Sequence, residues 1–163
     1  WGDIFGVAVF AVMLGMGRSL YAKFGKNISM FLLLGFAGSA VCYITAALSH
    51  NVFVGLAACA FTGFCVSMLW PGTLIYMADM IPHASVAIYA LLAAGGDLGG
   101  SVAPQLVGSI TDFVSQNGLF AAFAGSLTSE QIGFKVGMLI AAVFPLLGTV
   151  VALFMRRAEK NIN

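Results

Sequence analysis

The chain has 163 residues, of which 61% are hydrophobic and only 8% are charged, and its formal net charge is +1. Soluble domains carry about 25% charged residues, so this chain has too few solvated side chains to cover a water-exposed surface. The composition excludes a soluble globular protein, and the absence of a clustered basic face excludes a nucleic-acid partner. Three cysteines inside apolar stretches, without metal-ligand spacing, give no reason to expect a metal or a cofactor.

Two long stretches without Asp, Glu, Lys or Arg predict membrane spans. Residues 27–78 contain 52 consecutive uncharged residues, and residues 136–155 contain 20. Because one bilayer span needs about 20 apolar residues, the first stretch has room for two helices. Polarity returns at Ser49, His50 and Asn51, which divide those two helices. The predicted fold class is an all-α, polytopic bundle of transmembrane helices.

Five spans are predicted along the chain. They cover approximately residues 2–21, 28–48, 52–78, 84–112 and 129–155. Pro82 closes the third span, because proline lacks a backbone donor and disfavours helix at the residue before it. Thr128 and Gln131 match a capping box at the start of the fifth span. We expect a loop at 113–128 and a polar tail at 156–163.

The basic residues predict the orientation of these spans. Six of the seven fall on one side of the membrane, and they are Arg18, Lys23, Lys26, Arg156, Arg157 and Lys160. The seventh, Lys135, lies near a helix start, where its stem can reach the opposite interface. By the positive-inside rule, we expect the first turn and the C-terminus on the cytoplasmic side. We expect the membrane itself to be the cell (inner) membrane. The chain begins at Trp1 without the basic region of a signal peptide, so we expect further residues before it.

The fourth span carries the most unusual polar residues. Asp97 lies about 20 Å from the start of this span, inside the hydrocarbon zone. Ser101 and Gln105 follow at intervals of four, so the three residues form one polar stripe. A carboxylate at that depth costs about 2.5–3.5 kcal/mol on insertion scales, so it normally faces water or a partner. Asp97 is therefore predicted either to line a cavity or couple a proton, or to fix the packing of a neighbouring helix.

Glycines surround that stripe. Gly95 and Gly99, and likewise Gly96 and Gly100, are spaced so that another helix can approach closely. Gly108 and Pro104 follow in the same span. These residues serve either packing alone or flexing of the helix during a functional cycle.

The third span contains a proline next to a tryptophan. Pro71 removes one backbone hydrogen bond, so we expect a bend that frees a carbonyl and re-aims Trp70 and Thr73. The indole is either an ordinary packing group or a cavity-facing aromatic. The polar residues of the third and fourth spans predict that these two are interior, whereas the second and fifth spans face lipid.

The turn after the first span resembles a motif of the major facilitator superfamily of transporters. The family pattern is Gly-x-x-x-Asp-Arg-x-Gly-Arg, and Lys23, Gly25 and Lys26 match its basic, glycine and basic positions. Arg18 and Ala22 stand where the family has glycine and aspartate, so the role of that aspartate cannot be transferred. The run from Gly95 to Asp112 similarly resembles the eleventh helix of that family, and Trp70-Pro71-Gly72-Thr73 resembles the tenth helix of its fucose-permease-like sugar branch.

This resemblance implies that the chain corresponds to helices eight to twelve of such a transporter. It implies a secondary active transporter of small solutes working by alternating access, driven by protons or sodium, whose N-terminal half is absent. The implied cavity residues are Asp97, Ser101, Gln105, Trp70 and Thr73. The implied residues for conformational change or packing are Gly95, Gly96, Gly99, Gly100, Pro104, Gly108, Lys23, Gly25 and Lys26. The implied partners are the bilayer, the substrate and the missing half, and no enzymatic activity is expected.

Two alternatives stay open. An intramembrane aspartyl protease needs two carboxylates that share a proton, and Asp79 with Asp97 is the pair available. A noncatalytic membrane subunit would assemble through its Gly-xxx-Gly faces, including Gly133 and Gly137.

Overall fold

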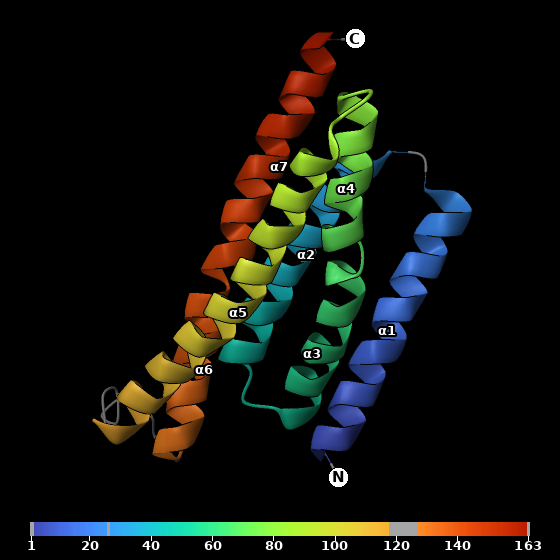
Figure 1. Ribbon diagram of the computed structural model, residues 1–163. Coiled ribbons are helices and arrows are strands. Elements are labelled where there is room, and N and C mark those ends of the chain that lie inside the picture. Colours follow the sequence, from blue (N-terminus) through green and yellow to red (C-terminus); the bar gives the residue numbers. More distant parts are fainter. Residues whose placement is uncertain (1, 26, 118–126, 163) are drawn as a thin grey trace.

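The chain folds into α-helices throughout the part that the computed structural model describes, residues 2–25, 27–117 and 127–162 (Figure 1). The helices are α1 (Gly2–Phe24), α2 (Ile28–Leu48), α3 (Val52–Val66), α4 (Leu69–Met80), α5 (Val86–Gln116), α6 (Ser129–Ala141) and α7 (Val143–Ile162). Within the described residues, five helical stretches are long and apolar enough to cross a membrane. The predicted all-α membrane class is thereby confirmed, and the chain fits an integral membrane protein.

Several helices run further than the sequence predicted. α1 continues to Phe24 and α5 to Gln116, and α7 continues through the expected tail to Ile162. The predicted ends at residues 21, 112 and 155 follow the return of polarity, but polarity does not end a helix: the Arg, Lys and Glu residues that extend α1 and α7 are good helix formers, and α5 continues through the half-apolar residues 113–116. Residues 118–126 of the expected loop at 113–128 lie outside the described residues.

Polar side chains fix where the helices begin. The Asn27 side chain accepts a hydrogen bond from the Met30 N–H, and that of Asn51 accepts one from the Phe53 N–H. At the start of α6, the Gln131 N–H donates to Thr128 Oγ1 at 3.3 Å, and the Thr128 N–H donates to Gln131 Oε1 at 3.1 Å. The predicted capping box is confirmed, and each cap satisfies donors that the first helical turn leaves unpaired.

The helical hydrogen bonding of two of the five spans is interrupted just before a proline, while the backbone stays in the right-handed helical region; we call each interruption a break. The third span is interrupted at Ser67 and Met68, between α3 and α4, and Pro71 is the third residue of α4. The fifth span is interrupted at Ala142, between α6 and α7, and Pro145 is the third residue of α7. The irregularity expected near Pro71 therefore lies one turn upstream, because the missing N–H acts on the carbonyl four residues earlier.

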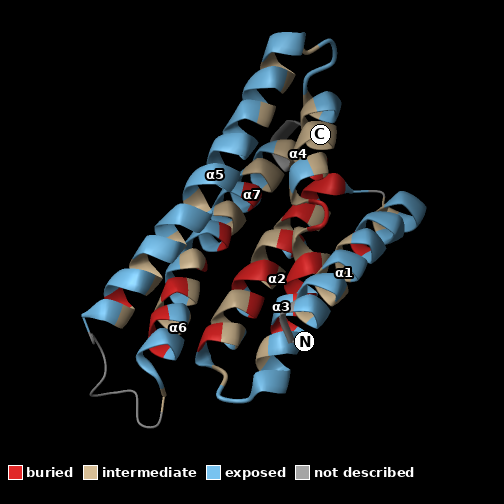
Figure 2. Ribbon diagram, turned by 60° about the horizontal axis from the view of Figure 1, so that its bottom comes forward, coloured by how far each residue is buried: buried red, intermediate tan, exposed pale blue. Residues whose placement is uncertain are grey.

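The helix α2 lies at the centre of the bundle and α5 at its edge (Figure 2). α2 packs against α3, α4, α6 and α7, whereas α5 packs mainly against α6. Ile28 and Leu32 of α2 form a core cluster with Met68. Within this chain, α2 has more helix neighbours than α5, while the predicted division into interior and lipid-facing spans refers to the whole bundle and stays a prediction.

The two ends of the bundle differ in charge. We call the end where α1, α4 and α7 finish the basic end, since Lys23, Arg156 and Arg157 lie there, with the C-terminus (Figure 1). The opposite end holds the α2–α3 connection, where Lys135 Nζ of α6 donates to the Ser49 carbonyl at 2.6 Å. This bond satisfies a carbonyl at the end of α2 and ties the fifth span to the second.

Candidate functional site

The polar stripe predicted on the fourth span lies on α5, and its side chains face away from the rest of the chain. Asp97, Ser101 and Gln105 are all exposed, and Val114 is the one buried residue of the helix. Ser101 Oγ donates to the Asp97 carbonyl at 2.8 Å, within its own helix. Among the described residues, the Asp97 carboxylate has no ion pair or hydrogen bond. The stripe therefore presents a carboxylate, a hydroxyl and an amide to whatever lies beside α5.

Trp70 and Thr73 line a cavity of about 670 Å³ between α4 and α5. The same cavity is lined by Gly95 and Gly96, so four of the predicted site residues share it. The Thr73 hydroxyl donates to the Trp70 carbonyl at 2.7 Å, and the Trp70 side chain is 52% exposed. A Cβ on Gly96 would lie 3.0 Å from Trp70 Nε1, so the indole rests directly on this glycine.

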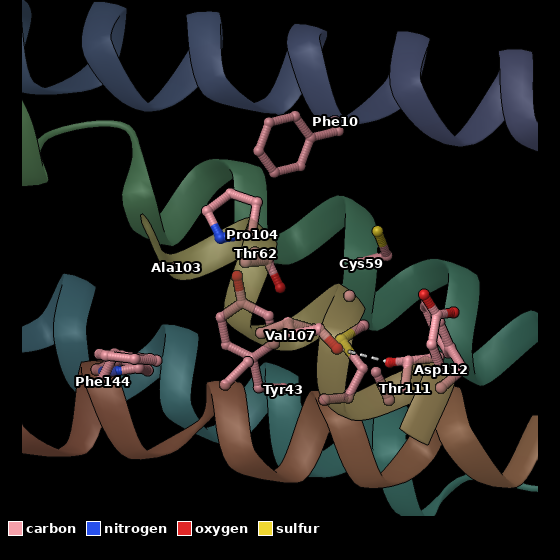
Figure 3. Close-up of a pocket in the computed structure, with 16 residues that line it drawn as sticks. Phe10, Tyr43, Cys59, Thr62, Ala103, Pro104, Val107, Thr111, Asp112 and Phe144 are labelled. Carbon is pink, nitrogen blue, oxygen red and sulfur yellow. Dashed lines mark hydrogen bonds between the residues drawn. The ribbon is translucent and has the colours of Figure 1, made fainter. Parts of the chain in front are cut away.

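A second cavity, of about 640 Å³, lies in the half of the bundle away from the basic end. Pro104 and Gly108 line it, so the predicted site residues of α5 are divided between two cavities. Phe10, Tyr43 and Phe144 form apolar walls that come from α1, α2 and α7 (Figure 3). None of the stripe residues Asp97, Ser101 and Gln105 lines either cavity.

The second cavity contains polar groups that were not predicted as a site. Thr62 Oγ1 donates to the Ala58 carbonyl and Thr111 Oγ1 to the Val107 carbonyl, so both hydroxyls serve their own helices. Tyr43 and Asp112 also line this cavity, and Asp112 is exposed. Tyrosine and threonine within an apolar span were the available signal, but only the fold shows that residues from α2, α3 and α5 converge.

The glycines of the two helices at the α5–α6 contact behave differently. Gly95, Gly99, Gly100 and Gly108 of α5 have open space where a side chain would be. On α6, by contrast, both glycines pack closely against α5. A Cβ on Gly133 would lie 2.5 Å from the Thr111 carbonyl oxygen, and one on Gly137 would lie 2.5 Å from Thr111 Oγ1. The assembly face predicted on Gly133 and Gly137 is wrong, because α5 of the same chain already occupies it.

The turn that resembles a transporter motif follows α1. Gly25 donates its N–H to the Tyr21 carbonyl at 2.6 Å, and a Cβ there would lie 2.5 Å from the Tyr21 ring. Glycine is required at this position by that close approach. Lys23 Nζ lies 5.4 Å from the ring centroid of Phe24, and Lys26 falls outside the described residues.

The pair of carboxylates considered for a protease does not share a cavity in the described part of the chain. Asp79 is the second-last residue of α4, at the basic end, and is exposed, whereas Asp97 is the twelfth residue of α5. No hydrogen bond joins them among those residues. The described residues also contain no group of three or more His, Cys, Asp or Glu that could hold a metal ion.

Comparisons with family models, with curated proteins and with solved structures found no match to this chain. What the sequence and the fold establish together is an all-α integral membrane protein, with five helical stretches able to cross a bilayer in its described part.

Proposed function

We propose that this chain is part of a secondary active transporter that moves a small solute across the cell membrane by alternating access. The observation that carries this proposal is the position of Asp97. It is exposed on the outer face of α5, about 17 Å along a helix that is long enough to span the membrane. A carboxylate at that depth is stable against water or a polar partner and not against lipid.

The prolines inside two spans support the same proposal. Proline is tolerated within a transmembrane helix where neighbouring helices, side chains or water satisfy the backbone groups that it frees. Here the helical hydrogen bonding of two of the five spans is interrupted before a proline, the backbone stays in the right-handed helical region, and cavities lie beside both α4 and α7. Under this proposal Asp97, Ser101 and Gln105 face the central aqueous pathway, and Trp70 and Thr73 contribute to its basic end.

The direction of the bundle follows from the charges. Under the positive-inside rule, the basic end and the C-terminus lie in the cytoplasm. The partners are then the bilayer, the solute with a proton or sodium ion, and the remaining helices of the transporter.

Neutralising Asp97 tests this proposal. In the full-length protein, reconstituted in vesicles with an imposed proton or sodium gradient, Asp97→Asn should lower gradient-driven uptake by about tenfold or more. The matched control is Asp79→Asn, which removes a carboxylate of equal size at the end of α4. If uptake by the Asp97→Asn protein equals that of the control at every pH and sodium concentration, Asp97 has no part in the mechanism.

A second candidate, a noncatalytic subunit, is favoured by one specific observation. The open glycines Gly95, Gly99, Gly100 and Gly108 let another helix approach α5 closely. Gly99→Leu separates the two: a subunit would lose its partner in co-purification from native membranes, whereas a transporter would remain one polypeptide with altered uptake.

A further inference from the structure

The break between α3 and α4 leaves one carbonyl without its helical donor. Pro71 has no N–H, so the carbonyl of Ser67, four residues earlier, cannot form the usual intrahelical bond. Ser67 is only 3% exposed, so water cannot readily replace that bond. An unsatisfied carbonyl is costly inside a membrane protein, because no water reaches the bilayer core to replace the lost bond.

Ser67 does not satisfy its own carbonyl. Its hydroxyl donates to the Phe64 carbonyl at 2.7 Å, and its N–H donates to the same oxygen at 3.3 Å. Both of its donors therefore point back into α3. Any donor for the Ser67 carbonyl therefore comes from another helix.

Arg18 of α1 supplies that donor. Its Nε donates to the Ser67 carbonyl oxygen at 3.2 Å, across 49 residues of sequence. α1 comes close enough because Gly17 is buried against the break, where a Cβ would overlap the Ser67 hydroxyl and lie 3.0 Å from the Phe64 carbonyl oxygen. Gly17 thus allows α1 to approach α3 closely, and the next residue, Arg18, forms the hydrogen bond.

We propose that Arg18 is a positioning residue, which holds the break between α3 and α4 and so sets the direction of α4. The helix it directs carries Trp70 and Thr73 into the cavity beside α5. The second break shows that this bond is particular to α4: within the described residues, no side chain donates to the carbonyl of Ala141, which Pro145 leaves without a donor. The consequence for the cavity rests on the transport function proposed above.

The test measures the effect of Arg18→Met with Pro71 present and again in a Pro71→Ala background. Pro71→Ala restores an N–H that can reach the Ser67 carbonyl, which makes Arg18 dispensable. The readout is the alkylation rate of Cys65, two residues before the break, in full-length protein with its other cysteines replaced by serine. Arg18→Met should raise this rate about tenfold, the size expected for losing a charge-assisted hydrogen bond. In the Pro71→Ala background, the same change should raise it less than twofold.

Lys23→Met is the matched control, because Lys23 is another cation of α1 and contacts the neighbouring Phe24 ring. It should leave Cys65 alkylation unchanged in both backgrounds. Should Arg18→Met accumulate too poorly, Arg18→Gln keeps a neutral donor and should give about a threefold rise. An Arg18→Met effect of equal size with Pro71 present and in the Pro71→Ala background would overturn the proposal, as would no effect in either.

Uptake measurements distinguish a failure of the role proposed for Arg18 from a failure of the proposed transport function. If the protein transports, Arg18→Met should raise the KM for uptake, and Pro71→Ala should restore it. An unchanged KM despite faster Cys65 alkylation would overturn the role of Arg18 at the cavity. If the wild-type protein shows no uptake while the alkylation pattern holds, the transport function fails and the bond to Ser67 still sets the break.

Discussion

The helices α2 and α5 are both long enough to cross a membrane, yet one is the centre of the bundle and the other is its edge (Figure 2). α2 has eight buried residues, whereas α5 has one, Val114. α2 carries no charged residue, and α5 carries Asp97 and Asp112. The difference teaches that an uncharged helix forms the centre of this chain, whereas the candidate span of lowest mean hydropathy in the described part faces outward.

The glycines of the two helices also differ in how closely other helices pack against them. A Cβ on Gly35 of α2 would lie 2.7 Å from the Cys65 carbonyl oxygen and 3.0 Å from a Leu69 methyl carbon. A Cβ on Gly99 of α5 would meet nothing within 4 Å. The same residue type therefore allows close helix packing in one span and is free of contacts in the other.

The largest expected effect comes from filling the glycine of α2. Gly35→Leu should destabilise the protein by about 3 kcal/mol or more, because the backbone of α3 cannot move away without opening the core. The thermal unfolding midpoint in detergent measures this, with Gly99→Leu as the matched control on α5. Equal losses in the two variants would show that α5 is packed as tightly as α2.

A smaller effect is expected where α5 does make contact. Gly133→Ala places a Cβ 2.5 Å from the Thr111 carbonyl oxygen and 3.3 Å from the Ser115 Cβ, so α5 and α6 must separate. We expect a loss of about 2 kcal/mol in stability, measured by the same unfolding midpoint. Gly108→Ala, in open space on α5, is the control and should show no loss.

The bond between α6 and the end of α2 should contribute less. Lys135→Met removes the 2.6 Å hydrogen bond to the Ser49 carbonyl and keeps the apolar stem of the side chain. The bond is partly buried, so the expected loss is about 1 kcal/mol. Lys23→Met is the control, and an equal shift of the unfolding midpoint in both variants would assign the effect to charge and not to this bond.

The smallest effect, and one of opposite sign, is expected from Gly99→Ala. Alanine favours helix over glycine by about 1 kcal/mol, and no described atom obstructs the new methyl group. The unfolding midpoint should stay constant or rise slightly. A fall would mean that another helix rests on Gly99 in the assembled protein, which would turn the edge of this bundle into an interface.

Much of the fold was predictable from where charge and caps occur. The charge-free stretches and the polar residues Ser49, His50 and Asn51 gave the number of spans, and Thr128 with Gln131 gave the start of α6. Pro71 predicted a bend in the third span, with a carbonyl freed from its helical bond. Pro145 carries the same signal in the fifth span, but its uniformly apolar surroundings offer no second sign of the break.

Contacts between distant residues could not be predicted. Nothing in the sequence pairs Arg18 with Ser67 or Gly133 with Thr111, because such contacts depend on which helices become neighbours. The candidate site shows the same limit. Trp70, Thr73, Gly95 and Gly96 do share one cavity, whereas Pro104 and Gly108 belong to a second one with Tyr43 and Asp112. Periodicity gives the faces of each helix, and only the fold decides which faces meet.

The bond from Lys135 to Ser49 also orders the assembly of the protein in time. The two residues are separated by 86 positions, so at about 5–20 residues per second the ribosome delivers Lys135 roughly 4–17 s after Ser49. Until then, the end of α2 has to hold its carbonyl in water or against the insertion machinery. The central helix of this bundle therefore enters the membrane well before α6 supplies the donor for its last carbonyl.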